Sequence, residues 1–89
     1  MRIDRFKWDK TNRSHLARHK VMPEEAEEVF IGPLYLRRSH SGRYLAYGRT
    51  LGGRYLVVVF ELYGTTVRVI TARDMTESEK SLYRRRAKR

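Results

Sequence analysis

The chain has 89 residues, 40% of them hydrophobic and none of them cysteine, so we expect one small domain over residues 1–89 without disulfides or thiolate metal sites. Twenty lysines and arginines against ten acids give a net charge of +10, which favours nucleic acid as a partner, then a membrane surface, then an acidic protein. No window approaches the roughly 20 apolar residues of a membrane span, and the N-terminal residues lack a continuous apolar stretch, so we expect a cytoplasmic protein without a signal peptide.

A short strand and a polar helix are expected first. Residues 3–8 place apolar side chains in imperfect alternation, which is typical of an edge strand. Asp9 suits a helix N-cap, because its carboxylate can accept hydrogen bonds from the free amides of the first turn. The helix is expected over about residues 10–19, where only Leu16 and Ala17 are apolar, so its burial should be shallow.

A second helix is expected to begin at Pro23. Proline presets φ for a first helical position, and the acids after it favour the positive end of the helix dipole. Ala26, Val29 and Phe30 recur at helical spacing and form a narrow apolar stripe. The Gly-Pro pair at 32–33 ends this helix.

Four strands are expected next, because the apolar period changes from that of a helix to that of a strand at residue 34. Tight-turn residues separate the strands, and three short links in succession predict an antiparallel meander. The run Leu56–Phe60 is apolar on both faces and predicts the central strand. The expected strands are residues 34–38, 44–51, 55–62 and 66–73.

The last expected element is a helix that begins at the capping-box pattern Thr76–Glu79 and runs into the basic residues 84–89. The predicted order is therefore β-α-α-β-β-β-β-α. This is an α+β fold with a four- to five-stranded antiparallel sheet, two N-terminal helices and one C-terminal helix.

Charge is distributed unevenly along the chain. Residues 29–60 contain five arginines and no acid, whereas four of the ten acids lie within residues 24–28. We therefore expect one basic face and one acidic helix.

The usual enzyme signatures are missing from the sequence, which has no glycine-rich phosphate loop, metal-ligand spacing or nucleophile elbow. His15 and His19 are four residues apart and could bring two imidazoles to a zinc ion. No third ligand stands in an obvious position, and a polar surface pair is the alternative. We therefore expect neither a metal nor a cofactor.

Arginine, histidine and tyrosine on a basic sheet remain, and this set can cleave RNA without a metal. The ribose 2′-hydroxyl attacks the adjacent phosphorus, a base accepts its proton, an acid protonates the leaving 5′-oxygen, and cations stabilise the phosphorane. Arg49, Arg68 and Arg73 lie in the predicted strands, and Tyr83 shares a helix face with Glu79. An ion pair between Arg73 and Glu79 that joins strand to helix is the structural alternative to catalysis.

These residues fall in segments that resemble the BrnT family of bacterial toxins. The resemblance covers about residues 6–83 and depends on the order and spacing of short motifs. The motifs are Phe6-Lys7-Trp8-Asp9, His19, Val21, Glu24-Glu25-Ala26, Val29-Phe30, Tyr47-Gly48-Arg49, Arg54, the segment from Arg68 to Arg73, Glu79-Lys80 and Tyr83. Departures from the family pattern occur at Asn12, His15, Arg18 and Lys20. At Lys20 the family has a glycine, which permits a positive φ.

The resemblance implies a RelE-like fold and a metal-independent endoribonuclease that inhibits translation. It also implies a BrnA-type antitoxin that neutralises the toxin in a hetero-oligomer, and whose own DNA-binding part represses the operon.

We therefore predict an endoribonuclease toxin of a type II toxin–antitoxin system. Arg49, Arg68 and Arg73 would bind and stabilise phosphate, with His19 or Tyr83 transferring protons. The Tyr83 hydroxyl would approach the strand end that carries Arg73. Further contacts with the RNA substrate are expected from Lys7, Arg37, Arg38 and Arg54. The alternatives are a non-catalytic nucleic-acid-binding module that uses the same basic sheet, and a cationic interaction subunit.

Overall fold

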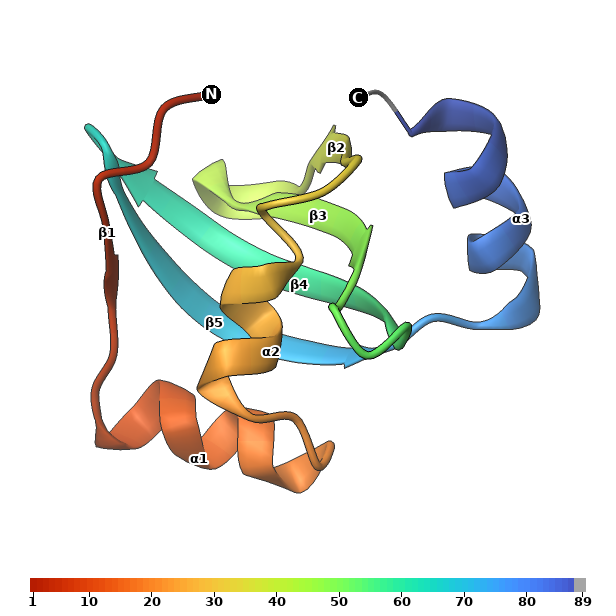
Figure 1. Cartoon of the computed structure of the whole chain (residues 1–89). Coiled ribbons are helices and arrows are strands. Elements are labelled where there is room, and N and C mark those ends of the chain that lie inside the picture. The colour runs from red at the N-terminus through yellow and green to blue at the C-terminus, as the bar shows by residue number, and fades with distance from the viewer. Residues whose placement is uncertain (88–89) are drawn as a thin grey trace.

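The computed structural model describes residues 1–87 and arranges them around one five-stranded sheet (Figure 1). The elements follow the order expected from the sequence, with a short 3₁₀ turn added at His40–Gly42. They are β1 (Arg5–Lys7), α1 (Lys10–Arg18), α2 (Pro23–Glu28), β2 (Tyr35–Arg38), β3 (Tyr44–Arg49), β4 (Tyr55–Tyr63), β5 (Thr66–Asp74) and α3 (Glu77–Arg86). Within residues 1–87, no helix combines the length and the apolar character needed to cross a membrane.

β4 is the central strand, as the sequence predicted, in a sheet with the order β1-β5-β4-β3-β2. β2 to β5 form the expected antiparallel meander. The sheet is not antiparallel throughout, however, because β1 pairs with β5 in parallel at one edge. No hairpin joins these two strands; the chain passes through both N-terminal helices and three strands before it returns beside β1, and such a long connection allows the parallel direction.

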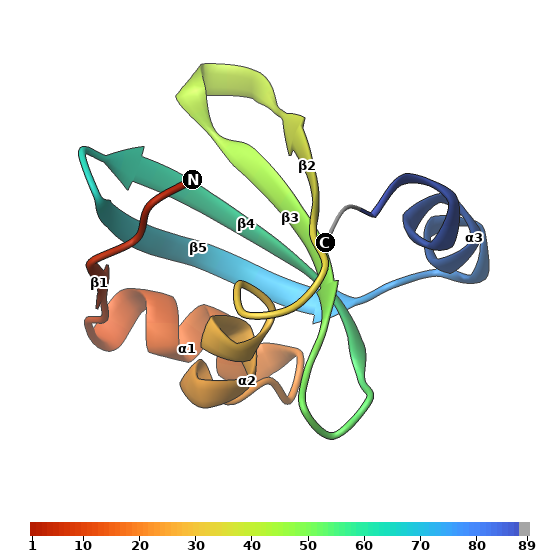
Figure 2. The same ribbon diagram turned by 45° about the horizontal axis from the view of Figure 1, so that its top comes forward.

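α1 and α2 cover one face of the sheet (Figure 2). Asn12 of α1 is buried there, and its side-chain amide donates to the carbonyls of Lys7 and Val69 at 2.9 Å each, which joins the helix to β1 and β5. The core between these helices and the sheet consists of Leu16, Val21, Ala26, Val29, Ala46, Leu56, Val58, Phe60, Val67, Val69 and Ala72.

The chain just after α2 lies directly against β3 at Gly48. A Cβ atom at this position would come within 2.8 Å of Val29 Cγ1 and 2.9 Å of the Val29 carbonyl oxygen, so a larger residue would push the two elements apart. This close approach places the end of α2 beside Arg49, the last residue of β3.

α3 packs against the opposite face, beside one end of the sheet and apart from α1 and α2 (Figure 2). Met75, just before the helix, and Tyr83 within it pack on Tyr47 of β3 and Val57 of β4 in a second, smaller apolar cluster. The C-terminal helix expected from the sequence thus sits where β3 ends, β4 begins and β5 ends.

Candidate active site

All five side-chain N–H groups of Arg54 donate hydrogen bonds within the chain. Nε and Nη2 donate to the two carboxylate oxygens of Asp74 at 2.7 and 3.0 Å. Nη1 donates to the Lys20 carbonyl at 2.7 Å and to Glu25 at 3.2 Å, and Nη2 to the His19 carbonyl at 3.1 Å. The bond to Asp74 raises the pKa of Arg54 and lowers the pKa of Asp74. Arg54, which the sequence predicted to contact RNA, therefore holds the turn between α1 and α2.

That turn contains Lys20 in the left-handed region, with φ of +55°. The resemblance noted in the sequence implies a glycine here, and Lys20 itself adopts the positive φ that a glycine would permit. A left-handed residue other than glycine costs roughly 1–2 kcal/mol. The bonds from Arg54 to the carbonyls of His19 and Lys20 help to offset this cost.

Arg73 forms the strand–helix ion pair foreseen as the structural alternative. Its Nη1 and Nη2 donate to the two carboxylate oxygens of Glu79 at 2.7 and 2.8 Å. The same carboxylate accepts the Thr76 backbone N–H at 2.9 Å and so caps α3. Mainly because of Arg73, the pKa of Glu79 falls to about 2. Both partners therefore stay charged and fix the start of α3 on the end of β5.

Arg68 also has an acidic partner, since its Nη2 lies 3.1 Å from Asp9. It sits beside Lys7 in the parallel pairing of β5 and β1. Arg37 and Arg38 lie in β2, at the opposite edge of the sheet. Neighbouring residues of a strand point to opposite faces, so these two arginines diverge. The predicted RNA contacts are therefore spread over the molecule.

Three cations instead gather around the ring of Tyr55, the first residue of β4. The Cζ atoms of Arg49 and Arg84 lie 4.8 and 5.4 Å from the ring centroid, and Lys80 Nζ lies 5.6 Å away. Lys80 is paired with Glu77 at 3.1 Å. Among residues 1–87, neither Arg49 nor Arg84 forms a salt bridge. Their guanidinium groups are available to an anionic ligand.

A cavity of about 540 Å³ opens beside these two arginines, and we call it the arginine pocket. Its walls combine the ends of α2, β3 and α3 with the start of β4 and the loop between α2 and β2. The side chains that carry chemistry in its lining are Glu28, Arg49, Tyr55, Tyr83 and Arg84.

Tyr83 forms a wall of the arginine pocket, and its hydroxyl is hydrogen-bonded to Pro33 rather than to Arg73. Its hydroxyl donates to the Pro33 carbonyl at 2.8 Å, and its ring meets Tyr55 edge to face at 5.9 Å. Burial raises the pKa of Tyr83, and nearby Arg49 opposes this rise. The hydroxyl proton is thus held by a backbone carbonyl, which anchors α3 to the loop before β2.

His19 lies outside the lining of the pocket. It is exposed at the C-cap of α1, near enough to Asp74 to lower the pKa of that carboxyl. His15 Nδ1 lies 3.2 Å from the Ile70 carbonyl. In the described part of the chain, no three histidine or acidic side chains converge as metal ligands.

The arginine pocket therefore contains two of the predicted catalytic residues, Arg49 and Tyr83. No motif in the sequence singled out Glu28, Tyr55 or Arg84. Glu28 is one of four acids within residues 24–28, and Arg84 is one of several basic residues near the C-terminus, so neither stood out from its neighbours. Only the position of Arg84 next to Tyr83 signalled that the two would share one end of the sheet.

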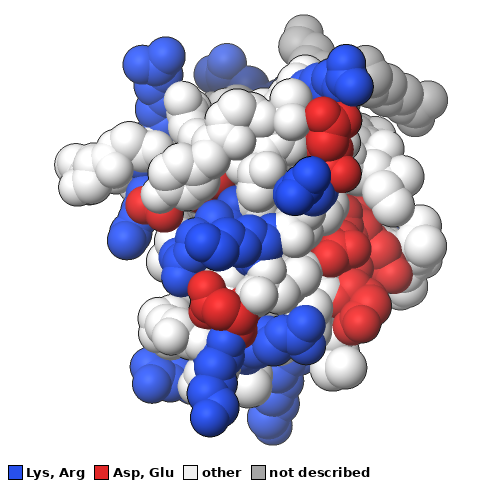
Figure 3. Space-filling model, turned by 90° about the vertical axis from the view of Figure 1, so that its left-hand side faces the viewer, with Lys and Arg blue, Asp and Glu red and all other residues white. Residues whose placement is uncertain are grey.

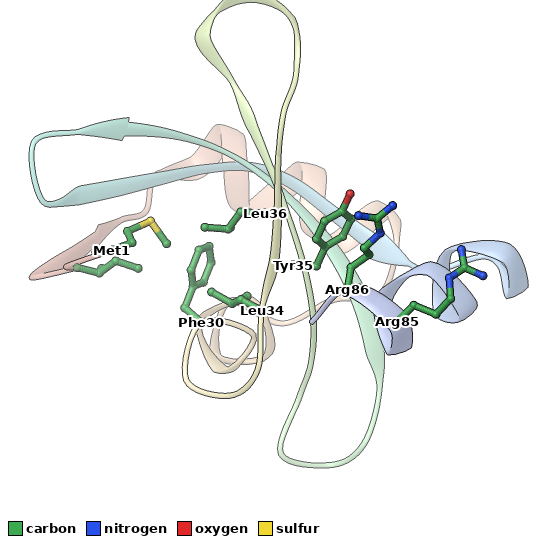
Figure 4. Close-up of a pocket in the computed structure, with 8 residues that line it drawn as sticks. Met1, Phe30, Leu34, Tyr35, Leu36, Arg85 and Arg86 are labelled. Carbon is green, nitrogen blue, oxygen red and sulfur yellow. The ribbon is translucent and has the colours of Figure 1, made fainter. Parts of the chain in front are cut away.

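A second, larger groove of about 760 Å³ runs along β2 (Figure 4). Its lining is mostly apolar, and arginines from the last turn of α3 border it. The lining residues are Met1, Ile3, Phe30, Leu34, Tyr35, Leu36, Arg85 and Arg86.

Seen from the β1 side, lysines and arginines are spread over the surface, whereas acids gather mainly in one patch (Figure 3).

The family model described as "Ribonuclease toxin, BrnT, of type II toxin-antitoxin system" matches residues 8–79 of the chain. Among solved structures, the chain is similar to the crystal structure of the Brucella abortus ribonuclease toxin BrnT. The TM-score is 0.69 and the sequence identity 21%, over 82% of this chain and 97% of that chain. This likeness confirms the predicted α+β fold. Comparison with curated proteins gives no match.

Proposed function

The chain belongs to the BrnT family of ribonuclease toxins of type II toxin–antitoxin systems, and from this premise we propose that it cleaves RNA at the arginine pocket. Arg49 and Arg84 carry the proposal, because both contact the Tyr55 ring, line one cavity and form no salt bridge among residues 1–87. Guanidinium groups suit a phosphodiester, whose oxygens they can bind in pairs. An aromatic ring offers a surface on which a base can stack.

We propose that the reaction is metal-independent. The 2′-hydroxyl attacks the adjacent phosphorus while Arg49 and Arg84 stabilise the negative charge that develops on the phosphorane. The sequence predicted His19 or Tyr83 for proton transfer, and of these two only Tyr83 lines the arginine pocket. Cleavage of RNA in the cytoplasm would inhibit translation.

Other cations would hold the RNA backbone outside the pocket. Proposed phosphate contacts are Lys7, Arg37, Arg38, Arg68 and Arg73. Arg68 and Arg73 would have to share their guanidinium groups with Asp9 and Glu79. Because of these ion pairs, we expect Arg68 and Arg73 each to contribute less to RNA binding than Arg49.

We also propose neutralisation by an antitoxin of the BrnA type that anchors in the groove along β2. This groove meets α3 at Arg85 and Arg86, next to Arg84 of the arginine pocket. A partner with apolar side chains in the groove and acidic side chains over α3 would neutralise these arginines. Leu36→Asp should then leave toxicity intact and prevent rescue by the co-expressed antitoxin. Full rescue of this variant would exclude the groove.

Cleavage of RNA by the purified chain in the presence of EDTA tests the central proposal. We expect Arg49→Ala to slow cleavage by about a hundredfold, because it removes a cation from the developing charge. Arg13→Ala is the matched control, since Arg13 is an exposed arginine of α1. Cleavage that requires an added divalent metal would contradict metal independence. RNA binding without cleavage by the wild-type protein would identify a non-catalytic binding module.

A further inference from the structure

Glu28 is the acid that α2 contributes to the arginine pocket. It is the last residue of the helix and half-buried. Its Oε1 accepts the backbone N–H of Leu51 at 3.0 Å, which fixes the carboxylate against the turn that follows Arg49. The close approach of Val29 to Gly48 holds this end of α2 in place. Glu28 is therefore positioned from two directions.

The other acids of α2 have different surroundings. Glu25 is paired with Arg54, and Glu27 accepts a hydrogen bond from Trp8 Nε1 at 2.7 Å. Glu24 is exposed. Glu28 forms no salt bridge among residues 1–87, although it lines the same cavity as Arg49 and Arg84. Its Oε2 accepts no hydrogen bond from the described residues. A carboxylate and two guanidinium groups thus face one cavity without neutralising one another.

We propose that Glu28 is the general base of RNA cleavage at the arginine pocket. This inference depends on the proposed function. Oε2 accepts the proton of the ribose 2′-hydroxyl, the bond from the 2′-oxygen to phosphorus forms, and the bond from phosphorus to the 5′-oxygen breaks. The 5′-oxygen takes a proton from water at the open mouth of the pocket. Glu28 returns its proton to the resulting hydroxide, so the products are a 2′,3′-cyclic phosphate and a 5′-hydroxyl.

Among the pocket residues, Glu28 fits this role best. Tyr83 commits its hydroxyl proton to the Pro33 carbonyl, and the guanidinium groups of Arg49 and Arg84 have donors but no acceptor atom. A positioned base of this kind contributes about a hundredfold or more to the rate.

Glu28→Gln separates catalysis from a structural role. Glutamine keeps the shape of the side chain and an oxygen for the Leu51 N–H, but it cannot accept the substrate proton. We expect cleavage to slow by about a hundredfold or more with an unchanged melting temperature. Binding of 2′-O-methyl RNA, which lacks the nucleophile, should be as tight or tighter because a negative charge has left an anion site. Glu24→Gln makes the same charge change on the same helix and should cleave like the wild type.

An active Glu28→Gln variant beside an active wild type would overturn this inference alone, and so would a rate loss matched by weaker RNA binding. A wild-type protein that cleaves no RNA would overturn the proposed function and the role of Glu28 with it. If Glu28→Gln fails to fold, Glu28→Asp and Glu28→Asn decide instead. Both side chains are one methylene shorter than glutamate, but only aspartate has a carboxylate that can accept a proton. The aspartate variant should retain measurable cleavage that the asparagine variant lacks, and equal rates would refute the proposal.

Discussion

Arg49 and Arg54 stand at the two ends of one turn and have opposite surroundings. Arg54 donates five hydrogen bonds to Asp74, Glu25 and the turn after α1. Arg49 contacts the Tyr55 ring and forms no salt bridge among residues 1–87. A guanidinium whose donors are all used within the chain holds the fold, whereas one with free donors can bind a ligand.

The turn itself separates the two arginines. The Thr50 backbone N–H donates to the Arg54 carbonyl at 2.8 Å, and Thr50 Oγ1 accepts the Arg54 N–H at 3.0 Å. Gly53 has φ of +89°, a conformation that side chains disfavour, so the chain reverses sharply there. Arg54 then reaches the α1–α2 side of the sheet and Arg49 the α3 side. Equal charge and closeness in sequence therefore say little about function.

Arg54→Ala should have the largest effect on stability. It would leave the carboxylates of Asp74 and Glu25 without their cation and the turn after α1 without its donor. We expect the free energy of unfolding to fall by about 3 kcal/mol, measured by urea denaturation. Arg54→Lys keeps the charge but loses the paired geometry, so it should recover only part of the loss. A stable Arg54→Ala protein would show that the five bonds contribute little.

The architecture was readable from the sequence because turn residues and apolar alternation are local signals. The glycines between the strands predicted the meander, and the two-sided apolar run at Leu56–Phe60 predicted the central strand. The parallel direction of β1 could not be predicted, since the sequence of a three-residue strand does not indicate whether it pairs in parallel or antiparallel. The pocket was only partly readable. Tyr55 and Arg84 are far apart in sequence and meet only after α3 docks on the sheet.

Glu79→Gln tests the second ion pair, the one that joins β5 to α3. The pKa of Glu79 is lowered from 4.5 to about 2, so this group stabilises the fold above about pH 4.5 and loses that contribution as the pH falls toward 2. At neutral pH we expect the variant to be less stable than the wild type by about 2 kcal/mol, a figure reduced because Arg73 is partly exposed. Urea denaturation across the acid range should show this difference shrinking. A gap that stays constant with pH would contradict the ionic origin.

Tyr83→Phe should have a smaller effect, because it removes one hydroxyl and keeps the ring. The Pro33 carbonyl would lose its donor, and we expect a loss of about 1 kcal/mol in the free energy of unfolding. If the hydroxyl only anchors α3, RNA cleavage measured below the melting transition should follow the folded fraction. A folded variant with strongly reduced cleavage would instead support Tyr83 as a proton donor.

Arg49→Ala should change stability least, because it removes only the contact with the Tyr55 ring, about 0.5–1 kcal/mol. Its effect should appear in RNA binding. Each phosphate contact that a protein makes with single-stranded nucleic acid adds about 0.7 to the slope of log K against log salt concentration. Binding of 2′-O-methyl RNA measured over a range of salt concentrations should therefore show a slope smaller by about 0.7 for this variant. Arg54→Lys, compared on its folded fraction, should keep the wild-type slope, because the Arg54 donors already have partners within the chain. If Arg54→Lys lowered the slope and Arg49→Ala did not, the assignment of one arginine to the fold and the other to the ligand would be reversed.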